Sequence, residues 1–158
     1  MYPTIYKVKN IGSGTLSVMA KPVSGEWIED EFHGLKMLGI DVIVSLLEHD
    51  EEREVGLREE SNLCSKNGIL FVSFPIPDRG LPDTTQARIL SEKLLLEINN
   101  GKHIVIHCRA GIGRTGIISG AILKESGLDT NLALELISSS RGVQVPDTKE
   151  QENWLANY

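Results

Sequence analysis

Three short apolar runs along the chain predict strands that are buried on both faces of a parallel sheet. They cover residues 42–47, 69–74 and 104–106. Between and after them, apolar residues recur three or four positions apart, which predicts helices with one buried face. The residues that mark these faces are Ile28, Phe32, Leu35 and Leu38 in one helix, Ala87, Leu90, Leu94 and Ile98 in a second, and Leu132, Ala133, Leu136 and Ile137 in a third.

Two further segments carry weaker patterns. Residues 5–8 and 16–19 flank the turn Gly12-Ser13-Gly14 and predict a hairpin added at the edge of the sheet. The stretch from Glu48 to Glu60 is rich in acidic residues and predicts a solvated helix or loop.

Capping signals place two helix starts. Asp83, with Gln86 three residues later, predicts an N-cap for the helix that carries Ala87. Asp147 and Glu150 have the same spacing and predict a capping box for the final helix.

This alternation of strands and helices predicts an α/β fold. We expect one domain over residues 1–158, with a central, mostly parallel sheet of four to five strands flanked by helices. Open sheets of this kind bind ligands at the carboxyl ends of their strands.

Charge and composition restrict the class of partner. The net charge of −6 argues against a general binder of nucleic acid or of anionic membranes, although a single site can still be locally positive. No apolar run approaches the roughly 20 residues of a membrane span, and the first residues do not resemble a secretory signal. Only two cysteines occur, Cys64 and Cys108, and free thiols favour a cytoplasmic location.

The chemistry concentrates where the run 104–106 ends and a helical segment begins. Cys108 and Arg114 stand six positions apart, with Gly111 and Gly113 between them. A helix N-terminus and nearby cations lower the pKa of a cysteine from roughly 8.5 toward 3.5–7.5, which produces a nucleophilic thiolate. The guanidinium of Arg114 can bind two oxygens of a phosphate and follow them into the transition state.

Other residues of this turn complete the expected site. Backbone N–H groups at the start of a helix bind phosphate oxygens, so the loop residues Arg109, Ala110, Gly111, Ile112 and Gly113 are predicted to contact substrate.

Three side chains have predicted catalytic roles beside the nucleophile. Thr115 can donate its hydroxyl to the cysteine sulfur as the thiolate leaves, and His107 can orient and polarise the cysteine. Asp78 follows the run 69–74 on a loop shaped by Pro75, Pro77 and Gly80, and is the predicted general acid.

The residues His107, Cys108, Arg114 and Thr115 form the pattern H-C-x(5)-R-[S/T], and the chain thereby resembles the protein tyrosine phosphatase superfamily. The resemblance extends from about Gly25 onward and is strongest to small dual-specificity-type enzymes of the kinase-associated phosphatase group and to compact prokaryotic tyrosine phosphatases. It implies the cysteine-phosphatase fold and a two-step mechanism without a metal or other cofactor.

In that mechanism, Cys108 attacks phosphorus and Asp78 protonates the leaving oxygen. Water then hydrolyses the phosphocysteine. Relatives often use a glutamine to position this water, and Gln144 and Gln151 are both candidates.

We therefore expect a monomeric phosphatase acting on phosphotyrosine in proteins, with phosphoserine and phosphothreonine as open additions. One alternative is a phosphatase for phosphoinositides or other non-protein esters, which the single basic residue between Cys108 and Arg114, Arg109, disfavours. Another is a non-catalytic phosphate-binding module. Cys64 is expected to be a buried apolar residue, and Glu48 a solvated charge rather than an orienter of Arg114.

Overall fold

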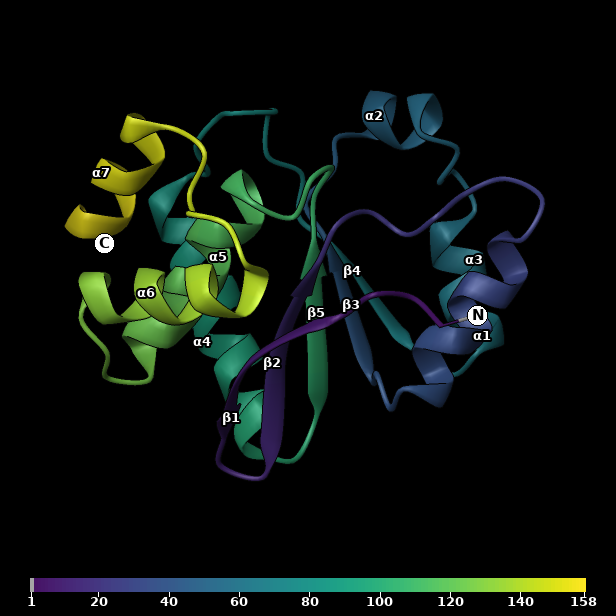
Figure 1. Cartoon of the computed structure of the whole chain (residues 1–158), viewed down its shortest axis with the longest axis horizontal. Helices are drawn as coiled ribbons and strands as arrows, with labels where there is room; N and C mark the ends of the chain where they lie inside the picture. Colours follow the sequence, from purple (N-terminus) through teal and green to yellow (C-terminus); the bar gives the residue numbers. More distant parts are fainter. Residues whose placement is uncertain (1) are drawn as a thin grey trace.

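A five-stranded sheet forms the centre of the protein (Figure 1). The structure is a computed structural model that describes residues 2–158. Its strands are β1 (Tyr6–Ile11), β2 (Gly14–Met19), β3 (Val42–Ser45), β4 (Leu70–Ser73) and β5 (His103–His107). They lie in the order β1-β2-β5-β3-β4, and every neighbouring pair is parallel except β1 and β2. The predicted α/β fold with a mostly parallel sheet is confirmed.

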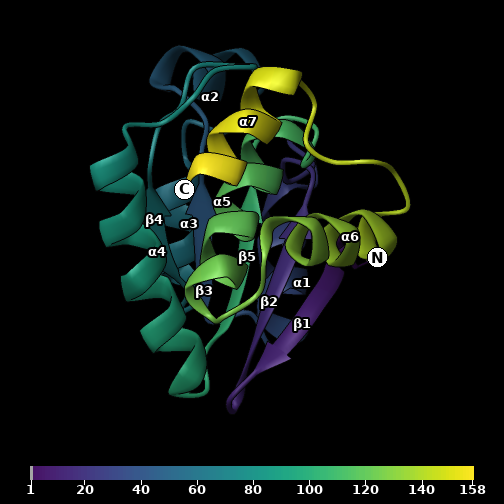
Figure 2. The same ribbon diagram turned by 90° about the vertical axis from the view of Figure 1, so that its left-hand side faces the viewer.

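Helices cover both faces of this sheet. Helices α4 (Thr84–Asn99), α5 (Gly113–Glu125), α6 (Thr130–Arg141) and α7 (Lys149–Asn157) lie on one side, and α1 (Ile28–Met37) and α3 (Glu60–Lys66) on the other (Figures 1 and 2). The short helix α2 (His49–Glu54) lies above the carboxyl ends of the strands. Within residues 2–158 no helix is both long and apolar enough to cross a membrane.

The predicted hairpin at the edge of the sheet is confirmed: β1 and β2 pair antiparallel around the turn at residues 12–13. Strand β1 is outermost, and residues 15–19 of β2 pair in parallel with β5, which joins the hairpin to the sheet. All six residues of β2 are buried, and the strand lies between β1 and β5 in the sheet. This position brings the carboxyl end of β2 beside the end of β5, where the predicted site begins.

Side chains from the two faces of β5 fill two separate cores. Ile104 and Ile106 pack toward α4, α5 and α6, whereas Val105 packs toward α1 and α3 with Phe32 and Leu35. Helix α5 is buried along ten consecutive residues, from Arg114 to Leu123. A helix enclosed on all sides is fixed by its packing. The turn that joins β5 to α5 is therefore anchored at both ends by core elements.

Of the two predicted N-caps, the one for α4 is confirmed and the one for α7 is wrong. Asp83 caps α4 as predicted, with its Oδ2 2.9 Å from the backbone nitrogen of Gln86. The capping box of α7 is formed by Thr148 and Gln151, not by Asp147 and Glu150. The helix begins one residue later than predicted because Thr148 has the extended backbone of an N-cap and its hydroxyl accepts from Gln151.

Part of the acidic segment is also different from the prediction. Glu51 on α2 and Glu60 at the start of α3 are buried rather than solvated. Leu38, which was predicted to share the buried face of α1, is exposed because the helix ends at Met37. Burying two carboxyl groups requires charged or hydrogen-bonding partners, which both residues find near the β5–α5 turn.

Gly14, at the start of β2, has no room for a side chain. A Cβ there would lie 2.1 Å from the carbonyl oxygen of Ile98 and 2.4 Å from that of Lys102. We expect Gly14→Ala to lower the free energy of unfolding by at least about 2 kcal/mol, because backbone atoms cannot yield as a side chain can. Urea unfolding would measure this, with Ser13→Ala at an exposed neighbouring position as control. Equal stability of the two variants would contradict the tight packing.

Candidate active site

The turn between β5 and α5 lines a cavity of about 220 Å³ at the carboxyl edge of the sheet. Most of the predicted site residues line it: Asp78, Cys108, Arg109, Ala110, Ile112, Gly113, Arg114 and Gln151. These residues come from the β4–α4 loop, the β5–α5 turn and α7. The fold thus brings together side chains that are up to 73 positions apart in the sequence.

The carbonyl groups of Cys108, Arg109 and Ala110 accept hydrogen bonds from donors that do not line this cavity. The carbonyl of Cys108 accepts from the Nδ1 of its neighbour His107 (3.1 Å), and that of Arg109 accepts from the backbone nitrogen of Lys21 (3.1 Å). The carbonyl of Ala110 accepts from the guanidinium of Arg141 (2.8 Å). Within residues 2–158, no backbone N–H from 109 to 113 donates to a protein acceptor. The turn therefore offers a set of free N–H groups, which is a binding site for an anion.

Gly111 lies on the side of the turn that packs against the backbone of Met19 and Ala20, not on the cavity side. Its φ of +75° is favourable only for glycine, and a Cβ would lie 2.4 Å from the carbonyl oxygen of Met19. Gly111 does not line the cavity, so the predicted contact of this residue with substrate is not seen. Its role is to let the backbone turn sharply between its neighbours.

Arg114 is almost fully buried and is held by several acceptors at once. Its Nη1 donates to Glu51 Oε1 (2.6 Å) and to the carbonyl of Ile76 (2.9 Å), and its Nη2 donates to Glu51 Oε2 (3.0 Å). The two carboxylate oxygens of Glu51 thus accept one hydrogen bond each from the planar guanidinium, in a bidentate arrangement.

Glu51 was missed by the sequence analysis, which considered only Glu48 as an orienter and expected it to be solvated. Glu48 is exposed and caps α2, and its backbone nitrogen donates to Glu51 Oε1 (3.1 Å). The signal that was available is the spacing of three between these glutamates, which is typical of a helix start. The sequence does not show that the helix turns its third residue inward.

The ion pair favours the charged form of both partners: the pKa of Glu51 is lowered and the pKa of Arg114 is raised. Burial by itself raises the pKa of Glu51, but the hydrogen bond from Arg114, the backbone bond at Glu48 and the charges of Arg114 and Arg109 bring it below the ordinary 4.5. Burial likewise lowers the pKa of Arg114, and the bond to Glu51 together with nearby negative charges raises it. Both groups therefore stay charged at neutral pH.

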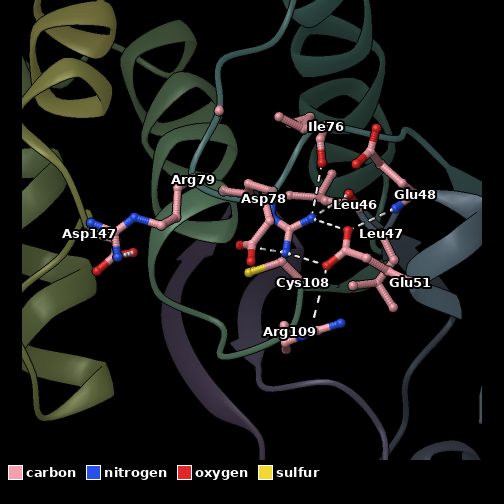
Figure 3. A network of polar contacts seen from close by, with 12 residues as sticks. Leu46, Leu47, Glu48, Glu51, Ile76, Asp78, Arg79, Cys108, Arg109 and Asp147 are labelled. Atoms are coloured by element: carbon pink, nitrogen blue, oxygen red, sulfur yellow. Dashed lines mark hydrogen bonds and ion pairs between the residues drawn. The ribbon is translucent and has the colours of Figure 1, made fainter. Parts of the chain in front are cut away.

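Asp78 lies beside Cys108, as predicted, and its Oδ1 accepts from Arg114 Nη2 at 3.0 Å (Figure 3). Its side chain remains 56% exposed, so it can reach both solvent and a bound ligand. The loop that carries it is fastened to the start of α7, because Arg79 pairs with Asp147 (3.2 Å) and the amide of Gln151 donates to the carbonyl of Gly80 (3.3 Å).

Thr115 and His107 lie beneath the turn rather than in the cavity. The hydroxyl of Thr115 is buried and makes no hydrogen bond within residues 2–158, so the predicted contact with the Cys108 sulfur is not formed in this structure. His107 contacts the Cys108 carbonyl through Nδ1 and the carboxylate of Glu60 through Nε2 (2.6 Å). Glu60 is the second carboxylate that the sequence analysis missed.

The two candidate glutamines occupy different places. Gln151 is fully buried and lines the cavity, where its Oε1 accepts from the backbone nitrogens of Asp147 and Thr148. Gln144 is exposed in a neighbouring hollow of the surface that does not contain Cys108.

Cys64 is a buried free thiol on α3, as predicted. Burial and the charge of Glu60 raise its pKa to about 12, so it stays neutral. Within residues 2–158, no group of three or more histidine, cysteine, aspartate or glutamate side chains is placed to hold a metal ion.

Comparison with known proteins agrees with this geometry. Cyclin-dependent kinase inhibitor 3 of the pig is 25% identical over 133 residues, which are 83% of this chain and 63% of that protein. The chain thus spans less than two thirds of the length of that relative. The solved structure of kinase associated phosphatase with its catalytic cysteine replaced by serine superposes with a TM-score of 0.88, at 22% identity, over 98% of this chain and 93% of the other.

The active form of Tk-PTP superposes with a TM-score of 0.73, at 27% identity, and covers 96% of this chain and 97% of the other. Residues 17–128 match the family model described as "Polymorphic toxin system, DSP-PTPase phosphatase". That match covers more than two thirds of the chain and includes the whole β5–α5 turn, and the resemblance predicted from His107, Cys108, Arg114 and Thr115 is confirmed. The protein belongs to this family of DSP-PTPase phosphatases.

Proposed function

We propose that the chain is a cysteine-dependent phosphatase that hydrolyses phosphotyrosine in proteins, with phosphoserine and phosphothreonine as further substrates, through a phosphocysteine intermediate. The observation that carries the proposal is the meeting of Cys108, the Arg114 guanidinium and the free backbone N–H groups of the β5–α5 turn at one cavity. This set can hold a tetrahedral dianion with its phosphorus above a sulfur nucleophile. All the groups required come from the protein, so we expect turnover without a metal ion.

Substrate binding rearranges one contact in this scheme. The guanidinium of Arg114 donates to Glu51 and to the carbonyl of Ile76, which do not line the cavity. One N–H of its Nη2 donates to Asp78, which does line the cavity. A phosphate that binds Arg114 displaces Asp78 from Nη2. The carboxyl group of Asp78 then lies near the ester oxygen rather than near the guanidinium. Cys108 Sγ attacks phosphorus, the ester P–O bond breaks, and Asp78 gives its proton to the leaving oxygen.

The second step reverses these roles. Water attacks the phosphocysteine, Asp78 accepts its proton, and the S–P bond breaks to release Cys108 as a thiolate. The hydroxyl of Thr115 makes no hydrogen bond within residues 2–158 and is available to donate to the departing sulfur. We assign the positioning of the water to Gln151, because it lines the cavity and keeps one N–H of its amide free beyond the bond to Gly80.

The charges around the cavity favour a substrate with a single phosphate. Arg109 pairs with Glu54 (3.0 Å) and Glu51 (3.7 Å), and Arg79 pairs with Asp147. The two exposed arginines at the rim are thus both matched by carboxylates. Phosphoinositides and inositol polyphosphates carry extra phosphates that would need unmatched cations here.

The first test is turnover of p-nitrophenyl phosphate in the presence of a chelator. We expect the wild-type protein to be active and Cys108→Ser to lose more than about 1,000-fold in kcat, because a hydroxyl at this position lacks an activating base. Activity that the chelator abolishes would contradict the metal-free mechanism. Phosphate binding without turnover in folded wild-type protein would favour a non-catalytic binding module. A panel of phosphopeptides and phosphoinositides then separates the substrate classes.

The second test isolates the acid. Asp78→Asn should lower kcat by about 100-fold or more on a phosphoserine peptide, whose alkoxide leaving group requires a proton. The loss on p-nitrophenyl phosphate should be much smaller, because nitrophenolate leaves without one. Asp83→Asn, which keeps the helix cap, is the matched control and should change neither rate. Equal losses on both substrates in Asp78→Asn would indicate that another group is the acid.

The third test concerns the Glu51 carboxylate. Glu51→Gln should lower stability by about 2–3 kcal/mol at pH 7, because Arg114 remains a buried cation without its counter-charge. The folded-state pKa of Glu51 lies below 4.5, so its contribution is complete above that pH and is lost as the pH falls through the folded-state value. The difference between wild type and variant in urea unfolding should therefore shrink below about pH 4.5. Asp50→Asn, at an exposed position on the same helix, is the control, and a difference that is constant with pH would exclude this role.

A further inference from the structure

A buried pair of side chains beneath the turn has no part in the mechanism above. The Nε2 of His107, at the end of β5, lies 2.6 Å from Glu60 Oε2, at the start of α3. The two side chains are 0% and 1% exposed. His107 lies on the side of the sheet that α1 and α3 cover, opposite the core into which Cys108 packs.

The contacts of His107 determine how many protons it shares with Glu60. Its Nδ1 faces the carbonyl oxygen of Cys108, which can only accept, so Nδ1 carries a hydrogen. If Nε2 and Glu60 Oε2 were both unprotonated, two lone pairs would face each other at 2.6 Å. One proton must therefore lie between them. The imidazole then connects the carboxyl group to the backbone of the nucleophile through two hydrogen bonds.

A buried pair of this kind destabilises the folded state more than apolar side chains would, which argues against a purely structural role. The other oxygen of Glu60, Oε1, is buried without a hydrogen-bond partner within residues 2–158. An unsatisfied buried oxygen of this kind destabilises the folded state, and an apolar pair of similar volume would avoid that loss. The partners of His107 on the neighbouring strands, Met19 in β2 and Ser45 in β3, are uncharged. Cys64, four positions after Glu60 on α3, stays neutral because burial and the charge of Glu60 raise its pKa to about 12.

We propose that Glu60 is a positioning residue for the nucleophile, acting through His107; the proposal rests on the phosphatase function above. Glu60 lies on the far side of the ring from Cys108. By sharing a proton with Nε2 it gives the ring positive character and makes its Nδ1–H a stronger donor to the Cys108 carbonyl. The positive end of this chain of hydrogen bonds is one residue from the sulfur, where it stabilises the thiolate.

The test replaces the carboxyl group with an amide of the same shape. In Glu60→Gln the ring keeps its Nδ1–H but becomes a neutral imidazole. Alkylation of Cys108 by iodoacetamide, followed by mass spectrometry of the modified peptide, should be about three- to tenfold slower than in wild type at pH 6. At pH 9.5, where more of the thiol is ionised in both proteins, the two rates should approach each other. Glu59→Gln, at the exposed neighbouring position, should behave as wild type at both pH values.

Kinetics distinguish positioning from a general loss of structure. Glu60→Gln should lower kcat at pH 6 and leave KM within about twofold, because the N–H groups and Arg114 still bind the phosphate. Glu60→Met, which removes both hydrogen-bonding capacity and charge, should lose more than Glu60→Gln. If both variants are only less stable and have wild-type alkylation rates when folded, the proposal is wrong.

A measurement on the wild-type protein requires no variant to fold. The ¹⁵N chemical shifts of the His107 ring, assigned through bonds from the backbone of uniformly ¹³C,¹⁵N-labelled wild-type protein, should show hydrogen on Nδ1 and a shared proton at Nε2. An unprotonated Nε2 would overturn the proposal. Both this spectrum and the alkylation rates are independent of turnover, so they test the role of Glu60 even if no phosphate ester proves to be a substrate.

Discussion

The burial of one guanidinium organises this molecule. Arg114 occupies the first turn of a helix that is enclosed along ten residues, so its charge cannot reach bulk water. It must be satisfied by groups that the fold brings to it, and these are the carboxylate on α2 and the carbonyl that follows β4. Three separate segments are thereby fixed around one side chain. The same contacts orient the guanidinium toward the cavity, so the requirements of stability and of phosphate binding coincide.

The outward-facing carbonyls of the β5–α5 turn follow the same logic. Three of them accept from different parts of the structure: the side chain of His107, the segment that follows β2 and the last residue of α6. Because these donors hold the carbonyls outside, the N–H groups are left for a ligand. An anion site that is prepared in this way needs little rearrangement when a phosphate enters.

The sequence alone was enough to predict the site residues that lie on one turn or directly after a strand. Cys108, Arg114 and the glycines between them lie on one turn, and Asp78 follows a strand that ends at the same edge, so their meeting could be predicted from the topology. Glu51 and Glu60 could not, because an acidic segment read along the chain gives no sign of which carboxyl groups turn inward. Their burial depends on tertiary packing of α2 and α3. The hairpin of β1 and β2 could be predicted from its turn, but its parallel pairing with β5 could not, because that pairing joins segments that are about 90 positions apart.

The contacts of α7 have a consequence for how the protein is made. Asp147 and Gln151 hold the loop that carries Asp78, and Gly113 lacks a side chain where Gln151 packs, so the cavity wall is complete only when α7 has docked. During synthesis Cys108 and Arg114 leave the ribosome before this helix does. If catalysis requires a fastened Asp78 loop, the protein becomes active only after α7 has docked, which is later than the formation of the sheet.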